Sequence, residues 1–298
     1  MKRLTAANVI HVMDKENIPA ITIMPGECIA VETAKPGIPD EVFTLDYTVE
    51  PYPRRILTIT GPIRVEGCRP GDILKVDIKE IQLHSAGKMW MGQWMGLLMD
   101  EVDHCYLRKV SVEEDAVLFR EDIRIPLRPM VGTIGVAPAG EAVDCLIPGE
   151  HGGNMDAPCV TAGCTLYLKA QTEGGLLSLG DVHAAMGYGE MLGTGVEIGS
   201  TVVLEISLVK DMPLRHPMVE NSEGWEIIVS GPDLPKLCRE ACRSAVALVM
   251  ERGGLSFDEA YALVGQTADL KIAQLVNPVG TVSVFIPKYI FSEIETGG

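Results

Sequence analysis

The sequence predicts a mainly β fold, a sandwich or barrel, that ends in a smaller portion containing two helices. Short runs that alternate between apolar and polar residues fill the first half of the chain, and turn residues separate them at regular intervals. Apolar residues take up helical spacing only after residue 232. Together these features indicate a sheet-based unit with helices near its C-terminal end.

The first half shows the alternation most clearly in the segment DILKVDIKEIQL, residues 72–83. Its apolar residues lie mostly on alternate positions, with lysines and acidic residues between them, as in a half-buried strand. Pro-Gly or Gly-Pro pairs at 25–26, 61–62 and 70–71 separate runs of this kind. Closely spaced turns are typical of β-sandwiches and barrels.

The second half continues with strand patterns at 199–209 and 225–231 and then changes character. In the helical segment that follows, Asp233 suits the N-cap and Pro235 the first turn. A further helix begins with a Ser and a Glu spaced as a capping box, and the last residues alternate like a strand.

We interpret residues 1–298 as a single unit. The β-rich part, 1–230, carries the site. The remainder, 231–298, is a helical pair plus a final strand that does not fold independently.

Composition limits the class of protein. A formal charge of −16 opposes binding to the phosphate backbone of nucleic acids. The eight cysteines are irregularly spaced and include no C-x-x-C pair, so we expect free thiols in a reducing cytoplasm. Asp14 interrupts the N-terminal segment before a signal-peptide core, and no segment approaches the roughly 20 apolar residues of a membrane-spanning helix. We therefore expect a cytoplasmic protein without nucleic-acid or membrane partners.

The segment PGEHGGNMDAP, residues 148–158, combines metal-binding side chains with glycines. Imidazole and carboxylate groups both bind zinc, so His151 and Asp156 are candidate ligands of one ion. Glycines permit close backbone approaches, and Glu150 and Asn154 add polar groups. The alternative is a surface turn in which the Asn and Asp side chains cap nearby backbone groups.

The segment LGDVHAAMGYGE, residues 179–190, favours a metal site over a surface turn. Asp181 and His183 lie two apart at the end of a predicted strand, so their side chains point the same way if the strand persists. Two glycines then bend the chain and present Glu190. The alternatives are that Asp181 caps a turn, that His183 packs in the core and that Glu190 has no role in a site.

The two segments HGGNMD (151–156) and LGDVHAAMGYGE (179–190) resemble the acetamidase/formamidase family. GPIRVEGCRPGDILKV (61–76), DLKIAQLVNP (269–278) and FIPK (285–288) are similar to other parts of that family, so the resemblance spans most of the chain in order. It implies a mainly β fold that includes a jelly-roll-like sandwich, with a smaller α+β portion. It also implies hydrolysis of a small amide to a carboxylate and ammonia, a divalent metal, and a homodimer or larger assembly. Zinc is the foremost metal, with calcium as a further ion.

The chain departs from the family's pattern at two places. Family members often carry an acidic residue where this chain has Ala34 and Lys35, and an Asp where it has Tyr188. Both changes remove a carboxylate near the expected site, so they bear on the substrate and on the number of metal ions. Glu32 and Asp46 are candidates to compensate.

Taken together, the candidate residues suggest a metal-dependent amidase that acts on a short linear amide, acetamide or formamide. We assign His151, Asp181 and His183 as metal ligands, Asp156 as a further ligand or as a residue that orients one, and Glu190 as the catalytic base. The sequence does not distinguish the roles of Asp156, Asp181 and Glu190, so Asp181 is also a catalytic candidate.

Other interpretations stay open. The chain lacks the G-x-S-x-G motif of a serine nucleophile, and Cys159 is the candidate for a cysteine nucleophile, although a buried thiol is the simpler interpretation. The site would also suit small cyclic amides such as lactams, or a β-sandwich protein that binds metal without catalysis. The Met- and Trp-rich segment at 88–99 is expected in the core or at a subunit interface, with the lining of an apolar substrate pocket as the alternative.

Overall fold

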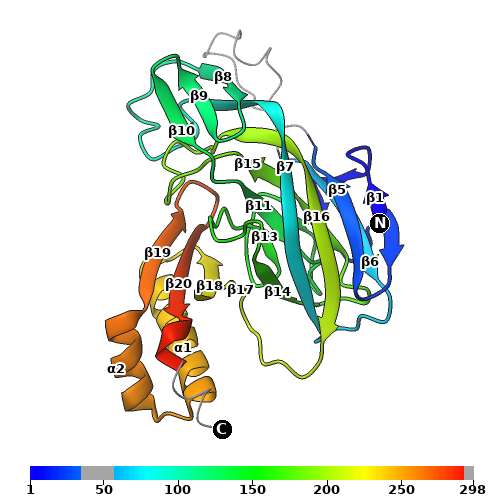
Figure 1. Ribbon diagram of the computed structural model, residues 1–298, viewed down its shortest axis with the longest axis vertical. Helices are drawn as coiled ribbons and strands as arrows, with labels where there is room; N and C mark the ends of the chain where they lie inside the picture. The colour runs from blue at the N-terminus through cyan, green and yellow to red at the C-terminus, as the bar shows by residue number, and fades with distance from the viewer. Residues whose placement is uncertain (35–56, 292–298) are drawn as a thin grey trace.

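The computed structural model describes residues 1–34 and 57–291, and within them the chain is mainly β with both α-helices near its C-terminal end (Figure 1). The strands up to residue 144 are β1 (Lys2–Leu4), β2 (Val9–Ile10), β3 (Val12–Met13), β4 (Ile21–Ile23), β5 (Glu27–Glu32), β6 (Ile59–Val65), β7 (Ile73–Met91), β8 (Tyr106–Val112), β9 (Ala116–Arg120), β10 (Ile123–Pro126), β11 (Met130–Gly135) and β12 (Val143–Asp144). The later strands are β13 (Gly152–Asn154), β14 (Thr165–Lys169), β15 (Leu177–His183), β16 (Glu197–Val209), β17 (Met218–Glu220), β18 (Gly224–Gly231), β19 (Asp269–Gln274) and β20 (Gly280–Pro287). The helices are α1 (Leu234–Gly253) and α2 (Phe257–Thr267), and a 3₁₀ turn at Lys288–Phe291 follows β20. The predicted mainly β fold with a C-terminal helical pair is confirmed.

Two long antiparallel strands, β7 and β16, run through the middle of the β structure (Figure 1). Their register places Val202 opposite Ile81 and Val209 opposite Ile73. The alternating segment at 72–83 is therefore a strand, and the same strand continues to Met91. Strand β16 also pairs with β5, and β7 also pairs with β8 and β14, so most of the sheet is connected through these two strands.

The turns expected at 25–26 and 70–71 do not join simple hairpins, and the expected turn at 61–62 is wrong, because Gly61-Pro62 lies inside β6. Strand β6 pairs with β2, β4 and β15, whereas β7, which follows it after the turn at 70–71, pairs with β8, β14 and β16. The sheet is therefore assembled from pairings between distant segments. Among the described residues the paired strands do not close into a barrel.

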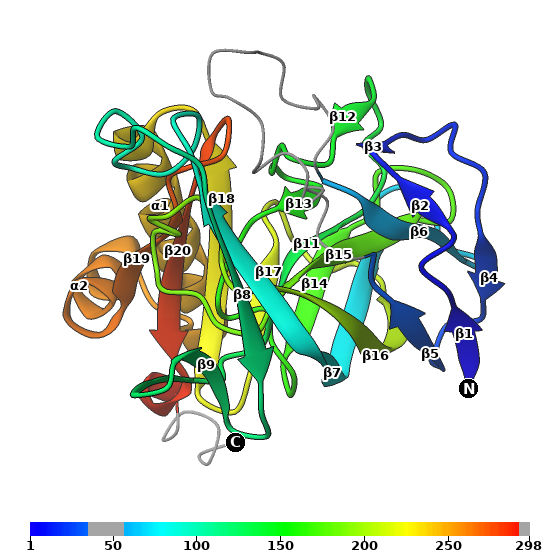
Figure 2. The same cartoon turned by 90° about the horizontal axis from the view of Figure 1, so that it is seen from above.

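The core of the β structure is aliphatic, which agrees with the low aromatic content of 5%. A second apolar cluster lies in the C-terminal portion, where α1 packs on β18 and β20. In both views this portion lies on the side of the molecule away from β1, β5 and β6 (Figures 1 and 2). Among the described helices, none combines the length and apolar character needed to cross a membrane.

The helix ends match the sequence prediction. The side chain of Asp233 accepts a hydrogen bond from the backbone of Lys236 at 3.1 Å and caps α1, and Gly254 takes the left-handed conformation at its end. Ser256 and Glu259 form the expected capping box at the start of α2. The division of the chain at residue 230 stays a prediction.

Candidate active site

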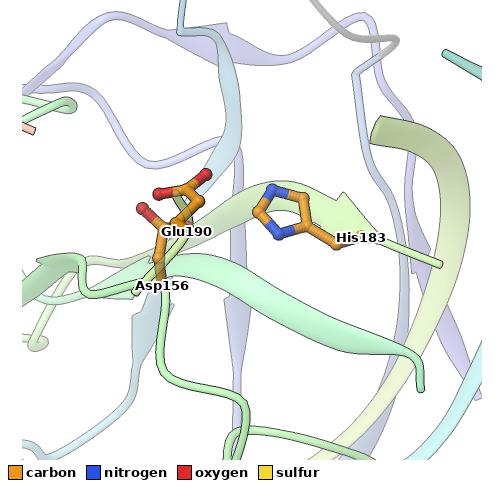
Figure 3. Close-up of side chains that lie close together, drawn as sticks. All are labelled: Asp156, His183 and Glu190. Carbon is orange, nitrogen blue, oxygen red and sulfur yellow. The ribbon is translucent and has the colours of Figure 1, made fainter. Parts of the chain in front are cut away.

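Five ionisable side chains come together near the ends of β13 and β15 and the start of β16. Asp181 and His183 end β15, and Glu197 begins β16. Asp156 follows β13, and Glu190 lies in the loop between β15 and β16. The carboxylates of Asp156 and Glu190 lie beside each other, and the imidazole ring of His183 faces them (Figure 3).

Two sets of three ligand atoms in this cluster are close enough to bind a metal ion. One set comes from Asp156, His183 and Glu190, the other from Asp181, His183 and Glu197, and the atoms within each set lie within 4.8 Å of one another. His183 belongs to both sets. In the second set its Nε2 lies 3.7 Å from Asp181 Oδ1 and 2.9 Å from Glu197 Oε1. The structure thus brings together four of the residues singled out in the sequence and adds Glu197.

His151 belongs to neither set. It is buried just before β13, and its Nε2 has no hydrogen-bond partner within the described residues. Burial lowers the pKa of His151 to about 4, so the ring is neutral at pH 7. A neutral imidazole is the form that binds a metal, but the role of His151 as a ligand stays a prediction.

The backbone is strained at three of the site carboxylates. Asp156, Asp181 and Glu190 have φ values of 43°, 56° and 47°, a region that non-glycine residues rarely adopt. Each such residue costs about 1–3 kcal/mol, and such strain is found mainly at functional sites. In β15 the unusual backbone of Asp181 interrupts the extended chain, yet its side chain still lies beside that of His183, as the sequence predicts.

Two glycines make room for these side chains. A Cβ on Gly132 of β11 would lie 2.5 Å from Asp156 Oδ1 and 3.0 Å from Asp181 Oδ2. A Cβ on Gly195, just before β16, would lie 2.6 Å from the ring of His183. Any larger residue at either position would force the acidic groups or the imidazole out of place.

Hydrogen bonds fix one oxygen of each of two aspartates. Asn277 Nδ2 donates to Asp156 Oδ2 at 2.6 Å, and Thr133 Oγ1 donates to Asp181 Oδ2 at 3.2 Å. Asn277 is itself held in the turn between β19 and β20, where its backbone N–H donates to the side chain of Gln274 at 3.0 Å. The C-terminal portion of the chain therefore contributes directly to the site.

Four other polar atoms of the cluster have no hydrogen-bond partner among the described residues. They are Asp156 Oδ1, Glu190 Oε2 and both ring nitrogens of His183, and all of them are buried. The short approach of His183 to Glu197 lacks the alignment of a hydrogen bond. Leaving a buried polar atom unpaired costs about 1–3 kcal/mol. Several unpaired atoms in one cluster therefore indicate that the cluster binds a ligand. Carboxylate oxygens around an imidazole nitrogen fit a divalent metal ion.

Burial and mutual repulsion favour protons on three of the four site carboxyl groups. The pKa of Asp181 instead lies below its usual value, because its burial is outweighed by the interaction with the charged ring of His183. Burial and the Asp181 carboxylate raise the pKa of Asp156 to about 6, and burial raises the pKa of Glu197 to about 8. Burial and Asp156 raise the pKa of Glu190 well above its usual range. Burial opposes a charge on His183, but the carboxylates of Glu197 and Asp181 outweigh it and raise the pKa of the ring. A cation would compete with these protons and stabilise the ionised carboxylates.

The departures from the family pattern can be located only in part. Tyr188 is half-buried, with Lys271 Nζ 5.5 Å from its ring centroid. Glu32 accepts a hydrogen bond from Arg3 Nε at 2.7 Å and belongs to neither ligand set. Lys35 and Asp46 lie outside the described residues.

The site opens into a cavity of about 460 Å³. Its polar lining residues are Asn154, Asp181, Glu190, Glu197, Asn277 and two threonines, Thr58 and Thr194. Trp90, Trp94, Met95 and Met99 form part of its apolar wall. We expected the Met- and Trp-rich segment at 88–99 in the core or at a subunit interface, but it also lines this cavity, because β7 extends past residue 83 and carries Trp90 to the site.

The cysteines are all free, as the sequence suggests. Burial and the neighbouring Glu226 raise the pKa of the Cys159 thiol well above its usual value. Such a thiol stays protonated near neutral pH, which opposes a role as nucleophile.

Comparison with known proteins gives a consistent result. The model of a family described as the Acetamidase/Formamidase family matches residues 8–146 and 139–293. The crystal structure of an acetamidase from Bacillus halodurans is 34% identical with a TM-score of 0.91, and the match covers 98% of this chain and 99% of that one. A structure from Thermoanaerobacter tengcongensis, described as a predicted acetamidase/formamidase, is 35% identical with a TM-score of 0.92, covering 98% of this chain and 97% of that one.

A Mycolicibacterium smegmatis acetamidase is 26% identical, and the match covers 51% of this chain. The match spans only about half, 53%, of that longer relative.

Proposed function

The chain belongs to the acetamidase/formamidase family and is an amidase, and we propose that it hydrolyses small linear amides in a metal-dependent reaction at the His183 cluster. Acetamide and formamide are the proposed substrates, and a carboxylate and ammonia are the products. The observation that carries the proposal is the pair of overlapping ligand sets around His183, whose atoms lie within 4.8 Å of one another in each set and include buried atoms without partners among the described residues.

A divalent metal ion is the cofactor that this cluster fits. We assign Asp156, Asp181 and His183 as its ligands, with His151 as a predicted further ligand. Zinc binds imidazole and carboxylate groups together, and calcium prefers oxygen ligands alone, so zinc is the better match for a set that contains His183. When bound, such an ion polarises the amide carbonyl and lowers the pKa of a coordinated water toward about 7.

Glu190 is the proposed catalytic base. Its Oε2 has no hydrogen-bond partner among the described residues, and its side chain lines the 460 Å³ cavity. Glu190 accepts a proton from the attacking water as the new C–O bond forms, and returns it to the leaving nitrogen as the C–N bond breaks. The raised pKa of its carboxyl group favours a side chain that holds a proton between these two steps.

The test is ammonia release from formamide and acetamide by the purified protein. Release that disappears after chelator treatment and returns with added zinc is the expected result. A protein that binds the metal but releases no ammonia from any amide would instead be a non-catalytic metal-binding β protein.

We also propose a homodimer or larger assembly. Phe257 and Tyr261 of α2 are 57% and 53% exposed, and Leu270 of β19 is 50% exposed, which is typical of surfaces that pack against a partner. Light scattering at several concentrations would reveal a monomer if this proposal is wrong. The free cysteines favour a reducing cytoplasmic location, which cell fractionation would check.

A further inference from the structure

A second cavity adjoins the site and is more apolar than the first. Its volume is about 990 Å³, and methionines and branched aliphatic residues make up most of its wall. Representative apolar residues of this wall are Met89, Met91, Ile125, Met186, Leu192 and Val196. The charged residues that line it are Glu101, Arg128 and Glu190. We call it the methionine cavity.

The two cavities meet at the proposed base. Glu190, Met95 and Thr194 line both of them. Every other site carboxylate that lines a cavity, namely Asp181 and Glu197, lines only the smaller one. An amide group held beside Glu190 would therefore have polar groups on one side and a large apolar space on the other.

We infer that this site takes primary amides whose acyl group is an apolar chain of several carbon atoms, with the amide group at Glu190 and the chain in the methionine cavity. The inference rests on the proposed amidase function and specifies its substrate class. Formamide has no carbon chain and acetamide has a single methyl group, so neither would extend along the apolar walls of the methionine cavity. Methionine side chains are flexible and adapt to chains of different shape, which suits a cavity lined by several of them.

The size of the effect follows from hydrophobic transfer. Burying one methylene contributes about 0.8 kcal/mol, which corresponds to about a fourfold gain in kcat/KM for each added methylene that enters the cavity. The gain should stop when the chain is long enough to reach past the apolar walls. A site built for formamide or acetamide alone would show no such series.

The experiment measures ammonia release by the zinc-loaded protein from formamide, acetamide, butanamide and hexanamide. We expect kcat/KM to rise along the series, with hexanamide well above acetamide. Equal or falling values beyond acetamide would overturn the inference but leave the amidase function intact. No ammonia from any amide would overturn the proposed function itself, so the two failures are distinguishable.

A substitution at Gly187 tests where the chain binds. Gly187 lines the methionine cavity, and a Cβ built on it meets no heavy atom within 4 Å. Gly187→Val should narrow the cavity and lower the ratio of kcat/KM for hexanamide to that for acetamide. Gly140→Val is the matched control, because Gly140 is an exposed glycine with equally open surroundings and lines neither cavity.

The ratio is informative even if Gly187→Val lowers overall activity. An unchanged ratio in Gly187→Val would place the chain outside the methionine cavity and contradict the inference. A ratio lowered equally by Gly140→Val would contradict it as well, because that residue does not line the cavity. The wild-type series remains decisive if the variant does not fold.

Discussion

The two carboxylate pairs around His183 differ in how their oxygens are used. Asp181 and Glu197 lie on β15 and β16, and their oxygens approach His183 at 3.7 Å and 2.9 Å. Asp156 and Glu190 lie outside the strands, and each keeps one buried oxygen without a partner among the described residues. We call the first the strand pair and the second the loop pair.

This difference indicates that the strand pair positions the imidazole ring, whereas Glu190 of the loop pair takes part in the reaction. The strand pair lies beside the imidazole, and its two carboxylates raise the pKa of the ring and so favour its charge. Each side chain of the loop pair keeps one oxygen without a partner among the described residues, and of the two only Glu190 lines the 460 Å³ cavity. Backbone strain does not separate the pairs, because Asp181 has a φ value of 56° beside 43° for Asp156 and 47° for Glu190. Changes at Glu190, the proposed base, should therefore affect turnover most, and changes at Asp156 or in the strand pair should affect metal binding.

The largest expected effect comes from Glu190→Gln in the loop pair. Glutamine keeps the shape of the side chain but cannot accept and return a proton, so kcat should fall by roughly 10²–10⁴-fold. Bound metal, measured by elemental analysis, should stay near the wild-type level. Glu141→Gln, an exposed glutamate in a loop, is the matched control. Near-normal turnover in Glu190→Gln would remove the base from the loop pair.

The strand pair is tested by Glu197→Gln. Removing the charge beside His183 Nε2 should weaken metal binding by roughly 10–100-fold, as is usual for groups that orient a ligand. Competition with a chromogenic chelator measures this directly. An unchanged metal affinity together with a large loss of turnover would mean that Glu197 belongs with the reacting groups, and the comparison of the two pairs would fail.

A smaller effect is expected from Asn277→Ala. Loss of the 2.6 Å hydrogen bond frees Asp156 Oδ2, and we expect about a tenfold loss of metal affinity, the low end of the range for such contacts. Asn221→Ala is the matched control, because the Asn221 side chain accepts backbone hydrogen bonds from Glu223 and Gly224 in a turn outside the ligand sets. Equal losses in both variants would point to general destabilisation instead of a role at Asp156.

His151 belongs to neither pair, and the effect expected from its burial is on the pH dependence of stability in the metal-free protein. Its pKa is about 4 in the folded protein against 6.5 in an unfolded chain, so the unfolded state takes up the proton first as the pH falls. Stability is therefore retained above pH 6.5 and decreases between pH 6.5 and 4, by about 2–3 kcal/mol near pH 4.5. Urea unfolding of the metal-free protein at pH 7.5 and 4.5 should show this loss, and His151→Asn should lack most of it. An identical pH dependence in the variant would contradict the buried neutral ring.

Local patterns in the sequence predicted the regular elements well. The caps of α1 and α2 depend on residues within one helical turn, so Asp233 and the pair Ser256 and Glu259 were sufficient. The strand at 72–83 was likewise predictable, because the alternation of apolar and polar residues within that segment is a local pattern. The pairing of strands was beyond reach, because segments on either side of the turn at 70–71 pair with distant partners instead of with each other.

The candidate site was predictable where its residues cluster in sequence. Asp156, Asp181, His183 and Glu190 fall in two short glycine-containing segments, which made them visible. Glu197 was missed because a single glutamate at the start of a strand carries no signal until β15 and β16 are aligned. Asn277 lies 121 residues from the aspartate that it contacts, and only the fold brings them together.

We propose that one metal-dependent cluster around His183 hydrolyses amides. The most direct measurement is a zinc titration of chelator-treated protein in which bound metal and the rate of ammonia release are followed on the same samples. We expect the rate of ammonia release to rise in proportion to bound zinc. His183→Ala should bind little zinc and should not regain ammonia release when zinc is added. Full turnover without bound metal, or recovery by zinc in His183→Ala, would contradict the proposal.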